Sequence, residues 1–162
     1  SAMELDEETI AFIKEVVREK KIHTLWFEAH YMYRKKLASF AEQFAPAKVK
    51  FRCGVETFDT ALREAWKKGI PSSVSVQDIA QHFQGICLLC CTQGETKEHI
   101  LKDIELAKAH FEYFSVNVFC DNHTPIKQDK ELASWFAKEV YPMIKDDPRI
   151  EVLMENTDLG VG

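Results

Sequence analysis

Strand-like and helix-like segments alternate along the whole of this chain, and this alternation constrains its fold more than any other feature. Apolar segments typical of buried strands occupy residues 23–30, 49–58, 85–91, 113–122 and 149–156. Amphipathic helical segments occupy residues 6–20, 33–44, 59–69, 76–83, 96–111 and 129–145. Such an order predicts an α/β fold with a parallel sheet covered by helices, either a doubly wound sheet or part of a β/α barrel. The periodicity does not choose between these two architectures.

The size and composition of the chain predict one domain. Its 162 residues are 46% hydrophobic and 29% charged, which supplies enough apolar material for a single core, and no compositional break divides them. We therefore expect a single domain over residues 1–162, in which Ser1 and Ala2 are a remnant of cloning.

Charge and hydropathy restrict the partners. The formal net charge is -5 and no basic stripe is visible, which argues against nucleic acid as a partner. No apolar run approaches the length of a membrane span and no signal-peptide pattern opens the chain, so we expect no membrane contact and a cytoplasmic location. Five cysteines, an odd number, favour reduced thiols or metal ligands over a disulfide framework.

Polar side chains follow each predicted strand. They are Glu28 and His30, Glu56 and Thr57, Glu95, Asp121 to His123, and Asn156 with Asp158. The carboxyl ends of parallel strands meet at one rim, and ligands bind at that rim. Taken singly, Thr57, Thr96 and Asp121 are better explained as helix caps or turn formers. The whole set predicts a ligand-binding rim.

Two strand-to-helix junctions carry motifs. In FRCGVETFDTALREAWKKGI (residues 51–70), a strand ends in Gly-Val-Glu-Thr and the next helix ends in Lys-Gly. In CCTQGETKEHILKDIELAKAHF (residues 90–111), Gly-Glu-Thr precedes an acidic helix with an alanine-rich end. In their order and spacing, these junctions resemble the fourth-strand and fifth-strand segments of radical S-adenosylmethionine enzymes. The resemblance covers residues 49–122, with Cys91 and Gln93 in place of a glycine and a proline of the family pattern.

The resemblance implies a partial β/α barrel of the TIM type, to which this chain contributes about five strands. It also implies that S-adenosylmethionine is held against a [4Fe–4S] cluster and cleaved reductively to a 5′-deoxyadenosyl radical. The family's Cys-x3-Cys-x2-Cys cluster loop has no counterpart among the five cysteines of this chain. We therefore expect a fragment without the amino-terminal cluster segment, inactive alone and with neither cofactor nor cluster bound to it alone.

Cofactor contacts follow from the resemblance residue by residue. Glu56 and Thr57 match positions that hold the ribose or the methionine end of the cofactor, although capping of the next helix explains them equally well. Leu89, Cys91 and Gly94 match the segment that packs on adenine. Asn117 lies on the next strand, which would offer backbone groups to the base. Glu95 is expected to stabilise its own loop or the following helix instead of contacting ligand.

The family gives no guidance on the substrate, which could be a small molecule or a peptide, or on the catalytic residues. Substrate candidates are therefore chosen by their place on the rim alone, and they are Glu28, His30, His123, Asn156 and Asp158.

The remaining question is whether Cys87, Cys90 and Cys91 hold a metal. Alternate side chains of a strand face opposite sides, so Cys87 and Cys91 should share one face while Cys90 takes the other. They should therefore not converge on one metal, and we predict no metal site. Cys53 and Cys120 are expected to lie inside strands as core residues.

Two further functions stay open. A metal-dependent barrel hydrolase or lyase would use residues that are good ligands for zinc or a harder metal, namely Glu28, His30, Glu56, His123 and Asp158. A non-catalytic module would bind a partner through an exposed sheet edge. The edge strand at residues 23–30, with Leu25, Trp26 and Phe27 expected to be exposed, predicts self-association.

Overall fold

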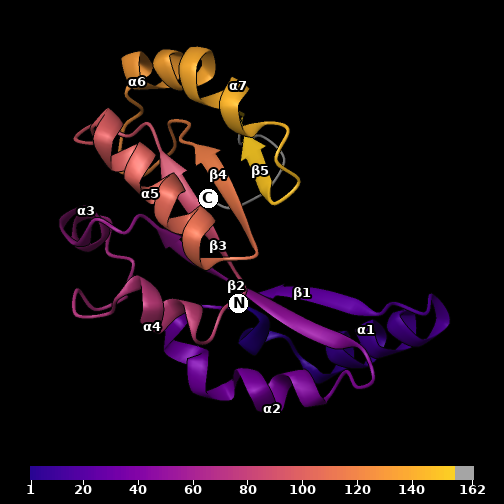
Figure 1. The fold of residues 1–162 in the computed structure, drawn as a ribbon. Helices are drawn as coiled ribbons and strands as arrows, with labels where there is room; N and C mark the ends of the chain where they lie inside the picture. The colour runs from indigo at the N-terminus through magenta and orange to yellow at the C-terminus, as the bar shows by residue number, and fades with distance from the viewer. Residues whose placement is uncertain (156–162) are drawn as a thin grey trace.

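Figure 1 shows a computed structural model in which five parallel strands form one sheet. The structure describes residues 1–155. The strands are β1 (Thr24–Glu28), β2 (Lys48–Glu56), β3 (Gly85–Cys90), β4 (Tyr113–Val118) and β5 (Ile150–Leu153), and each pairs in parallel with the next. All five predicted strands are therefore confirmed.

The helices connect these strands. They are α1 (Glu7–Glu19), α2 (Leu37–Glu42), α3 (Thr60–Ala65), α4 (Val76–Ala80), α5 (Lys97–His110), α6 (Lys130–Trp135) and α7 (Tyr141–Ile144), with the short helices η1 (Ala2–Glu4) and η2 (Tyr31–Lys36) and the π-helical η3 (Phe136–Val140). The helix predicted at 129–145 is the run α6, η3 and α7, and its π-helical part lies just before Pro142, which has no N–H to donate.

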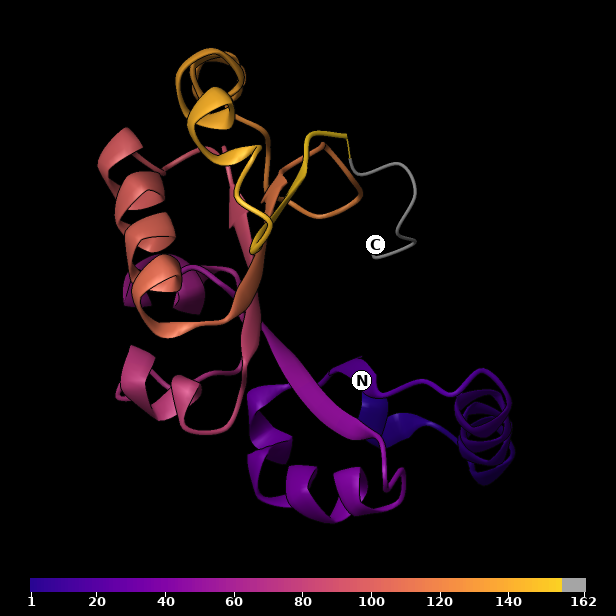
Figure 2. The same ribbon diagram turned by 45° about the vertical axis from the view of Figure 1, so that its right-hand side comes forward.

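The order of the strands decides between the two predicted architectures. A doubly wound sheet reverses its strand order at a switch point, whereas here every strand lies beside its neighbour in the sequence. Figure 2 shows the resulting curl, with α4 and α5 on the outer side of the central strands. The fold is therefore part of a TIM-like β/α barrel.

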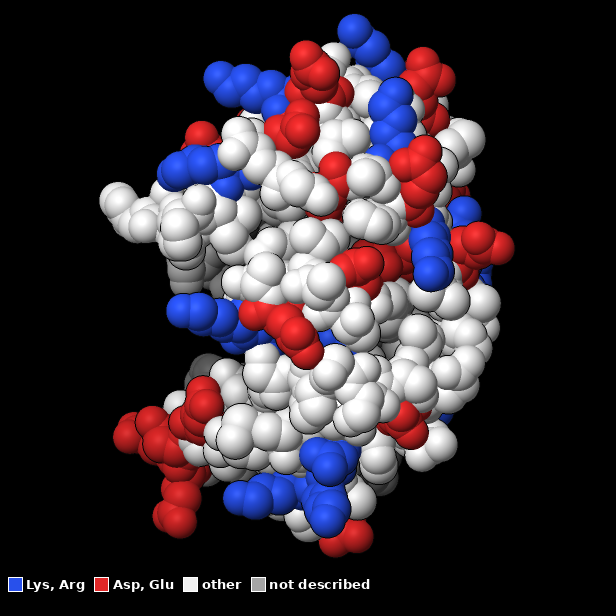
Figure 3. Space-filling model, turned by 90° about the vertical axis from the view of Figure 1, so that its left-hand side faces the viewer, with Lys and Arg blue, Asp and Glu red and all other residues white. Residues whose placement is uncertain are grey.

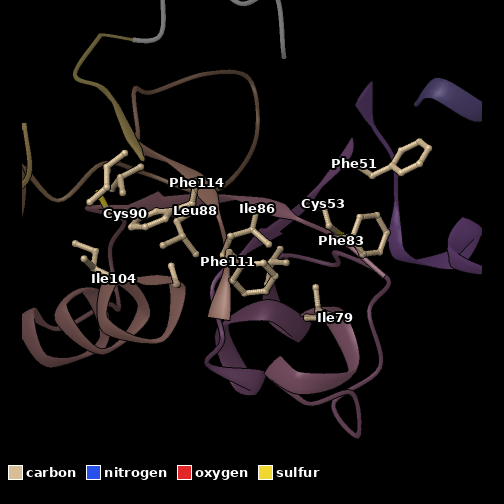
Figure 4. Close-up of a cluster of buried hydrophobic side chains, with 14 of the residues drawn as sticks. Phe51, Cys53, Ile79, Phe83, Ile86, Leu88, Cys90, Ile104, Phe111 and Phe114 are labelled. Atoms are coloured by element: carbon tan, nitrogen blue, oxygen red, sulfur yellow. The ribbon is translucent and has the colours of Figure 1, made fainter. Parts of the chain in front are cut away.

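Strand β2 shows how the curled sheet separates a core from a polar face. Phe51, Cys53 and Val55 are buried, whereas Arg52 between them and Glu56 after them remain partly exposed. The buried side packs into the cluster labelled in Figure 4, whose side chains come from β2, β3, β4, α4 and α5 and their flanking residues. The convex side of the sheet therefore carries the core, and the concave side carries polar groups.

Strand β1 forms one edge of the sheet. Its Phe27 packs on Phe40 and Phe44, with ring centroids 5.1 Å and 5.2 Å apart. Leu25 is also partly covered, so Trp26, at 40% exposure, is the part of the expected apolar surface that lies open. The expected exposure of Leu25 and Phe27 is therefore wrong, because α2 and the residues after it pack on Phe27 and because Leu25 packs against the core. Self-association stays a prediction.

A floor of aromatic side chains lies across the amino end of the concave face. Trp26 of β1 and Tyr113 of β4 meet there with ring centroids 5.7 Å apart, although two strands separate them. Gly85 makes this contact possible, because a Cβ added to it would lie 2.8 Å from the carbonyl oxygen of Tyr113 and 3.1 Å from the Trp26 ring. Lys50 adds a cation 5.3 Å from the centroid of the Trp26 ring and forms an ion pair with Glu112.

The surface carries mixed charge. On the face drawn in Figure 3, acidic and basic side chains are interspersed, and no continuous basic area appears on that face. Among the described residues, no helix has the length and apolar character needed to cross a membrane.

Substitution of Gly85 by alanine tests the aromatic floor. Gly85→Ala should lower the free energy of unfolding by about 1–3 kcal/mol, because the added methyl meets a backbone carbonyl that cannot move aside. Gly54→Ala is the matched control, since a Cβ there meets only the ends of Glu56 and Glu28, at 3.3 Å and 3.9 Å. Urea denaturation of both variants measures the difference, and equal losses would contradict the assigned role of Gly85.

Candidate active site

A cavity of about 410 Å³ opens on the concave face near the carboxyl ends of the strands. All five strands contribute to its lining, as does the loop after each of α3 and β4. The lining residues are Glu28, Arg52, Glu56, Trp66, Lys68, Cys87, Leu89, Ser115, Asn117, Phe119, Cys120, Asn122, Thr124, Ile126 and Leu153. Of the polar residues predicted to form a rim, Glu28, Glu56 and Asn122 meet here.

A larger hollow of about 720 Å³ lies elsewhere, between α1 and the connection from α2 to β2. Its lining includes Val17, Phe44 and Pro46, together with His23 and Ala47 at the amino ends of β1 and β2. Ligands of parallel α/β sheets bind at the opposite, carboxyl ends. We therefore assign the site to the smaller cavity.

Glu56 ends β2 in a left-handed backbone conformation. Its φ is 67°, and the register between β2 and β3 shifts between Gly54 and Glu56. The Oε1 atom of Glu56 accepts a hydrogen bond from Nζ of Lys68 at 2.8 Å, at the edge of the cavity. Helix α3 is capped instead by Asp59, whose side chain accepts from the backbone N–H of Leu62 at 2.9 Å. Capping therefore does not explain Glu56, and its carboxylate faces the cavity.

The loop after α3 places Lys68 beside Glu56. Lys67 and Gly69 flank it with φ values of 54° and 67°, which turn the chain sharply. The carbonyl oxygen of Lys68 accepts from Nε2 of His30 at 2.7 Å, while Nδ1 of His30 accepts from the N–H of Met32 at 3.2 Å. The neutral tautomer with its proton on Nε2 satisfies both bonds. His30 therefore links the segment after β1 to the loop after α3.

Thr57 is fully buried and lies outside the cavity. Its Oγ1 accepts from the N–H of Asp59 at 3.0 Å, and its hydroxyl also bonds to the carboxylate of Asp103. Asp103 accepts from the N–H of Phe58 at 3.0 Å as well. Burial raises the pKa of Asp103, and these hydrogen bonds oppose that effect. The pair ties the turn after β2 to α5.

Glu95 performs a similar structural role in the turn after β3. Its Oε2 accepts from the backbone N–H of Thr92 at 2.6 Å and from the Thr92 hydroxyl at 2.9 Å. Gly94 takes the positive φ of 95° that this turn requires, and Thr96 caps α5 by accepting from the N–H of His99 at 3.2 Å. The expectation that Glu95 stabilises its own loop is confirmed.

No protein-family model matches this chain, and no curated protein matches it. Among solved structures, the queuine lyase from Clostridium spiroforme bound to SAM and queuine matches with a TM-score of 0.89 and 38% sequence identity. The match covers 99% of this chain and 69% of that protein. The chain belongs to the radical S-adenosylmethionine superfamily. The resemblance carried by the two junction motifs is thereby confirmed.

The radical S-adenosylmethionine (radical SAM) assignment makes the positions of the predicted cofactor contacts informative. Leu89 and Asn117 line the cavity with Glu56. The Oδ1 atom of Asn117 is buried and has no hydrogen-bond partner among the described residues, which is the condition expected of a group that meets a ligand. Gly94 shapes the turn after β3 and does not line the cavity. Cys91, like Thr57, is fully buried and does not line the cavity, so the structure brings together only part of the predicted set.

The left-handed conformation of Cys91, with φ at 67°, accounts for the glycine that radical SAM proteins carry there. The same conformation breaks the alternation of the strand, so Cys91 does not share a face with Cys87. Cys91 instead lies in the core beside Cys90, with their sulfur atoms 3.7 Å apart, while Cys87 faces the cavity. The expected pairing of faces is therefore wrong. Cys120 also lies at the cavity and not in the core.

The cysteines of this chain do not fit the iron–sulfur cluster of the superfamily. Within residues 1–155, no group of three or more His, Cys, Asp and Glu side chains could hold a metal ion. The metal-dependent barrel alternative also loses support. Of its proposed ligands, Glu28, His30, Glu56 and His123 lie within residues 1–155, and they form no group that could hold a metal ion.

The substrate candidates separate in space. Glu28 lines the cavity, His30 is engaged with the loop after α3, and His123 is exposed in the loop after β4. Asn156 and Asp158 lie outside the described residues.

Sequence reasoning missed Arg52, Lys68 and Ser115, all of which line the cavity. The segment KVKFRCGVE contained a signal for Arg52, because charged residues alternate there with apolar ones and so share the face of Glu56. No local pattern indicated Lys68, which reaches the cavity through a turn.

The buried carboxyl of Glu95 predicts a pH dependence of stability. Burial raises its pKa from 4.5 to about 7, so the folded protein keeps a proton that the unfolded chain releases between these values. This stabilisation is fully present below pH 4.5 and lost as the pH passes 7, and it amounts to up to about 3 kcal/mol. Urea denaturation of the wild type should therefore show the free energy of unfolding falling over this interval.

Glu95→Gln should flatten much of that pH dependence, leaving the smaller slope in the same direction that Asp103 contributes. Glu98→Gln is the matched control on the exposed first turn of α5, where hydrogen bonding lowers the pKa of the carboxyl. An unchanged slope in Glu95→Gln would show that Glu95 titrates normally.

The cysteine geometry makes a second prediction. After anaerobic reconstitution with iron and sulfide, residues 1–162 should hold no stoichiometric [4Fe–4S] cluster and should not cleave S-adenosylmethionine. Iron and sulfide analysis with absorption spectroscopy checks this. One cluster per chain would mean that at least three of the five thiols converge, contrary to their positions in β2, in β3 and the residue after it, and in the loop after β4.

Proposed function

We propose that this chain forms the S-adenosylmethionine rim and the substrate cavity of a radical SAM lyase that acts on queuine or a closely related 7-deazaguanine base. The observation that carries the proposal is the 38% identity to the queuine lyase over 99% of this chain. The polar cavity at the carboxyl ends of the strands supports it, since the base, amine and diol of queuine all need hydrogen-bonding partners.

The residues around Glu56 fit a nucleoside sulfonium cofactor. The carboxylate of Glu56 would accept hydrogen bonds from ribose hydroxyls or from the methionine ammonium, with Lys68 holding it in place. Leu89 would pack on the adenine ring, and the unpartnered Oδ1 of Asn117 would accept a hydrogen bond from an N–H of the cofactor. When bound, S-adenosylmethionine supplies the radical chemistry of the superfamily.

The floor of the barrel would orient the substrate. Trp26 and Tyr113 obstruct the amino end of the concave face, so a ligand would enter from the carboxyl end, where the cavity opens. A volume of about 410 Å³ is in the range of small-molecule pockets. This size favours a base over a larger peptide as the substrate. Reduced cysteines at five positions accord with a cytoplasmic location.

Ligand binding to the complete protein tests the proposal. The protein should bind S-adenosylmethionine and then queuine, measured by isothermal titration calorimetry under anaerobic conditions. Binding of S-adenosylmethionine without any binding of queuine would overturn the assignment of the substrate.

Glu56→Gln should weaken S-adenosylmethionine binding about tenfold, because the variant keeps the shape of the side chain but loses its charge. The absorption spectrum of the cluster in the complete protein should not change. Glu112→Gln is the matched control, since it removes a carboxylate that also pairs with a lysine but lies at the amino end of the sheet. Unchanged affinity in Glu56→Gln would exclude Glu56 from the site and leave the cofactor assignment dependent on the turn at Gly94.

A further inference from the structure

The concave face places one carboxylate and one guanidinium side by side beneath the cavity. Glu28 and Arg52 are register partners on β1 and β2, and Oε2 of Glu28 lies 3.4 Å from Nε of Arg52. Both side chains are partly exposed and both line the cavity. The acceptor oxygens of the Glu28 carboxylate therefore lie beside the N–H donors of the Arg52 guanidinium.

Arg52 is held in position from its other side. Its Nη1 lies 3.8 Å from Oε2 of Glu151, and the hydroxyl of Tyr113 donates to the same carboxylate at 2.9 Å. The guanidinium thus lies between two carboxylates, on β1 and β5, and its remaining N–H groups stay available as donors.

The other oxygen of Glu28 lies over Gly54 of β2, on the side of Glu56. A Cβ added to Gly54 would lie 3.9 Å from Oε1 of Glu28 and 3.3 Å from Oε1 of Glu56. Within residues 1–155, Glu28 forms an ion pair with Arg52 alone. Its carboxylate therefore retains acceptor capacity toward the cavity.

We propose that Glu28 and Arg52 recognise the pyrimidine edge of the substrate base. This inference rests on the proposed function. The edge of a 7-deazaguanine presents a ring N–H, an exocyclic amino group and a carbonyl oxygen in a row. Glu28 accepts from the two donors, and Arg52 donates to the carbonyl oxygen.

The same pair rejects the adenine of the cofactor. The corresponding edge of adenine presents a ring nitrogen with a lone pair in place of the N–H, which would face a carboxylate oxygen, and an amino group in place of the carbonyl, which would face the guanidinium. Both contacts are mismatched, and a ligand that leaves the donors and acceptors of its site unpaired binds less tightly than one that matches them. The cavity therefore sorts its two ligands, with Glu56 and Asn117 on the cofactor and Glu28 and Arg52 on the substrate.

A purely structural ion pair is the competing explanation. With exposed fractions of 30% for the Arg52 side chain and 53% for that of Glu28, such a pair contributes little to stability. Glu28→Gln should consequently fold and melt like the wild type, which leaves ligand discrimination as the decisive measurement.

The experiment compares queuine with its analogue that lacks the exocyclic amino group, titrated into the complete protein saturated with S-adenosylmethionine. In the wild type, loss of the amino group should weaken binding about 10- to 100-fold. In Glu28→Gln, queuine should bind at least about tenfold more weakly and the two bases should bind nearly alike. The affinity for S-adenosylmethionine should stay unchanged, and Glu112→Gln should discriminate like the wild type.

Two failures are distinguishable. If the wild type binds no queuine, the proposed function fails and this inference fails with it. If the wild type binds queuine and Glu28→Gln keeps the full discrimination against the analogue, only the inference about Glu28 and Arg52 is overturned.

Discussion

The alternation of side chains along β2 is the constraint on which the rest of the structure depends. Phe51, Cys53 and Val55 are buried in the core, while Arg52 and Glu56 point to the concave side. Since β2 pairs with β1 on one side and β3 on the other, both sets are held in register with their neighbours. A core and a polar cavity therefore arise from the same strand, and a slip of one residue would exchange them.

Left-handed residues at the ends of two strands then shape the rim. Glu56 and Cys91 both have a φ of 67°, and at each position the chain leaves the regular alternation. Glu56 still faces the cavity, on the same side of β2 as Arg52, whereas Cys91 enters the core. Such a conformation costs a non-glycine residue about 1–2 kcal/mol. Burial of the Cys91 side chain and the ion pair of Glu56 with Lys68 offset this cost.

Burial divides the carboxylates of the rim into two groups with different roles. Asp103 and Glu95 are buried and accept hydrogen bonds from backbone N–H groups of the turns after β2 and β3. Glu28 and Glu56 are less buried and pair with Arg52 and Lys68, so they keep acceptor capacity for a ligand. Asp103 and Glu95 thus stabilise the turns, and Glu28 and Glu56 are available to contact a ligand.

The sequence by itself determined the order of strands and helices, their parallel arrangement and the two junction motifs, because these depend on periodicity and on residues close together in the chain. It also located Glu28 and Glu56, since each follows or ends its strand. Tertiary structure alone decided that the sheet curls in sequential order and that Lys68 reaches Glu56 through a turn held by His30. It also decided that Cys91 turns inward. These outcomes depend on contacts between distant segments and on left-handed backbone dihedrals, and neither leaves a periodic trace in the sequence.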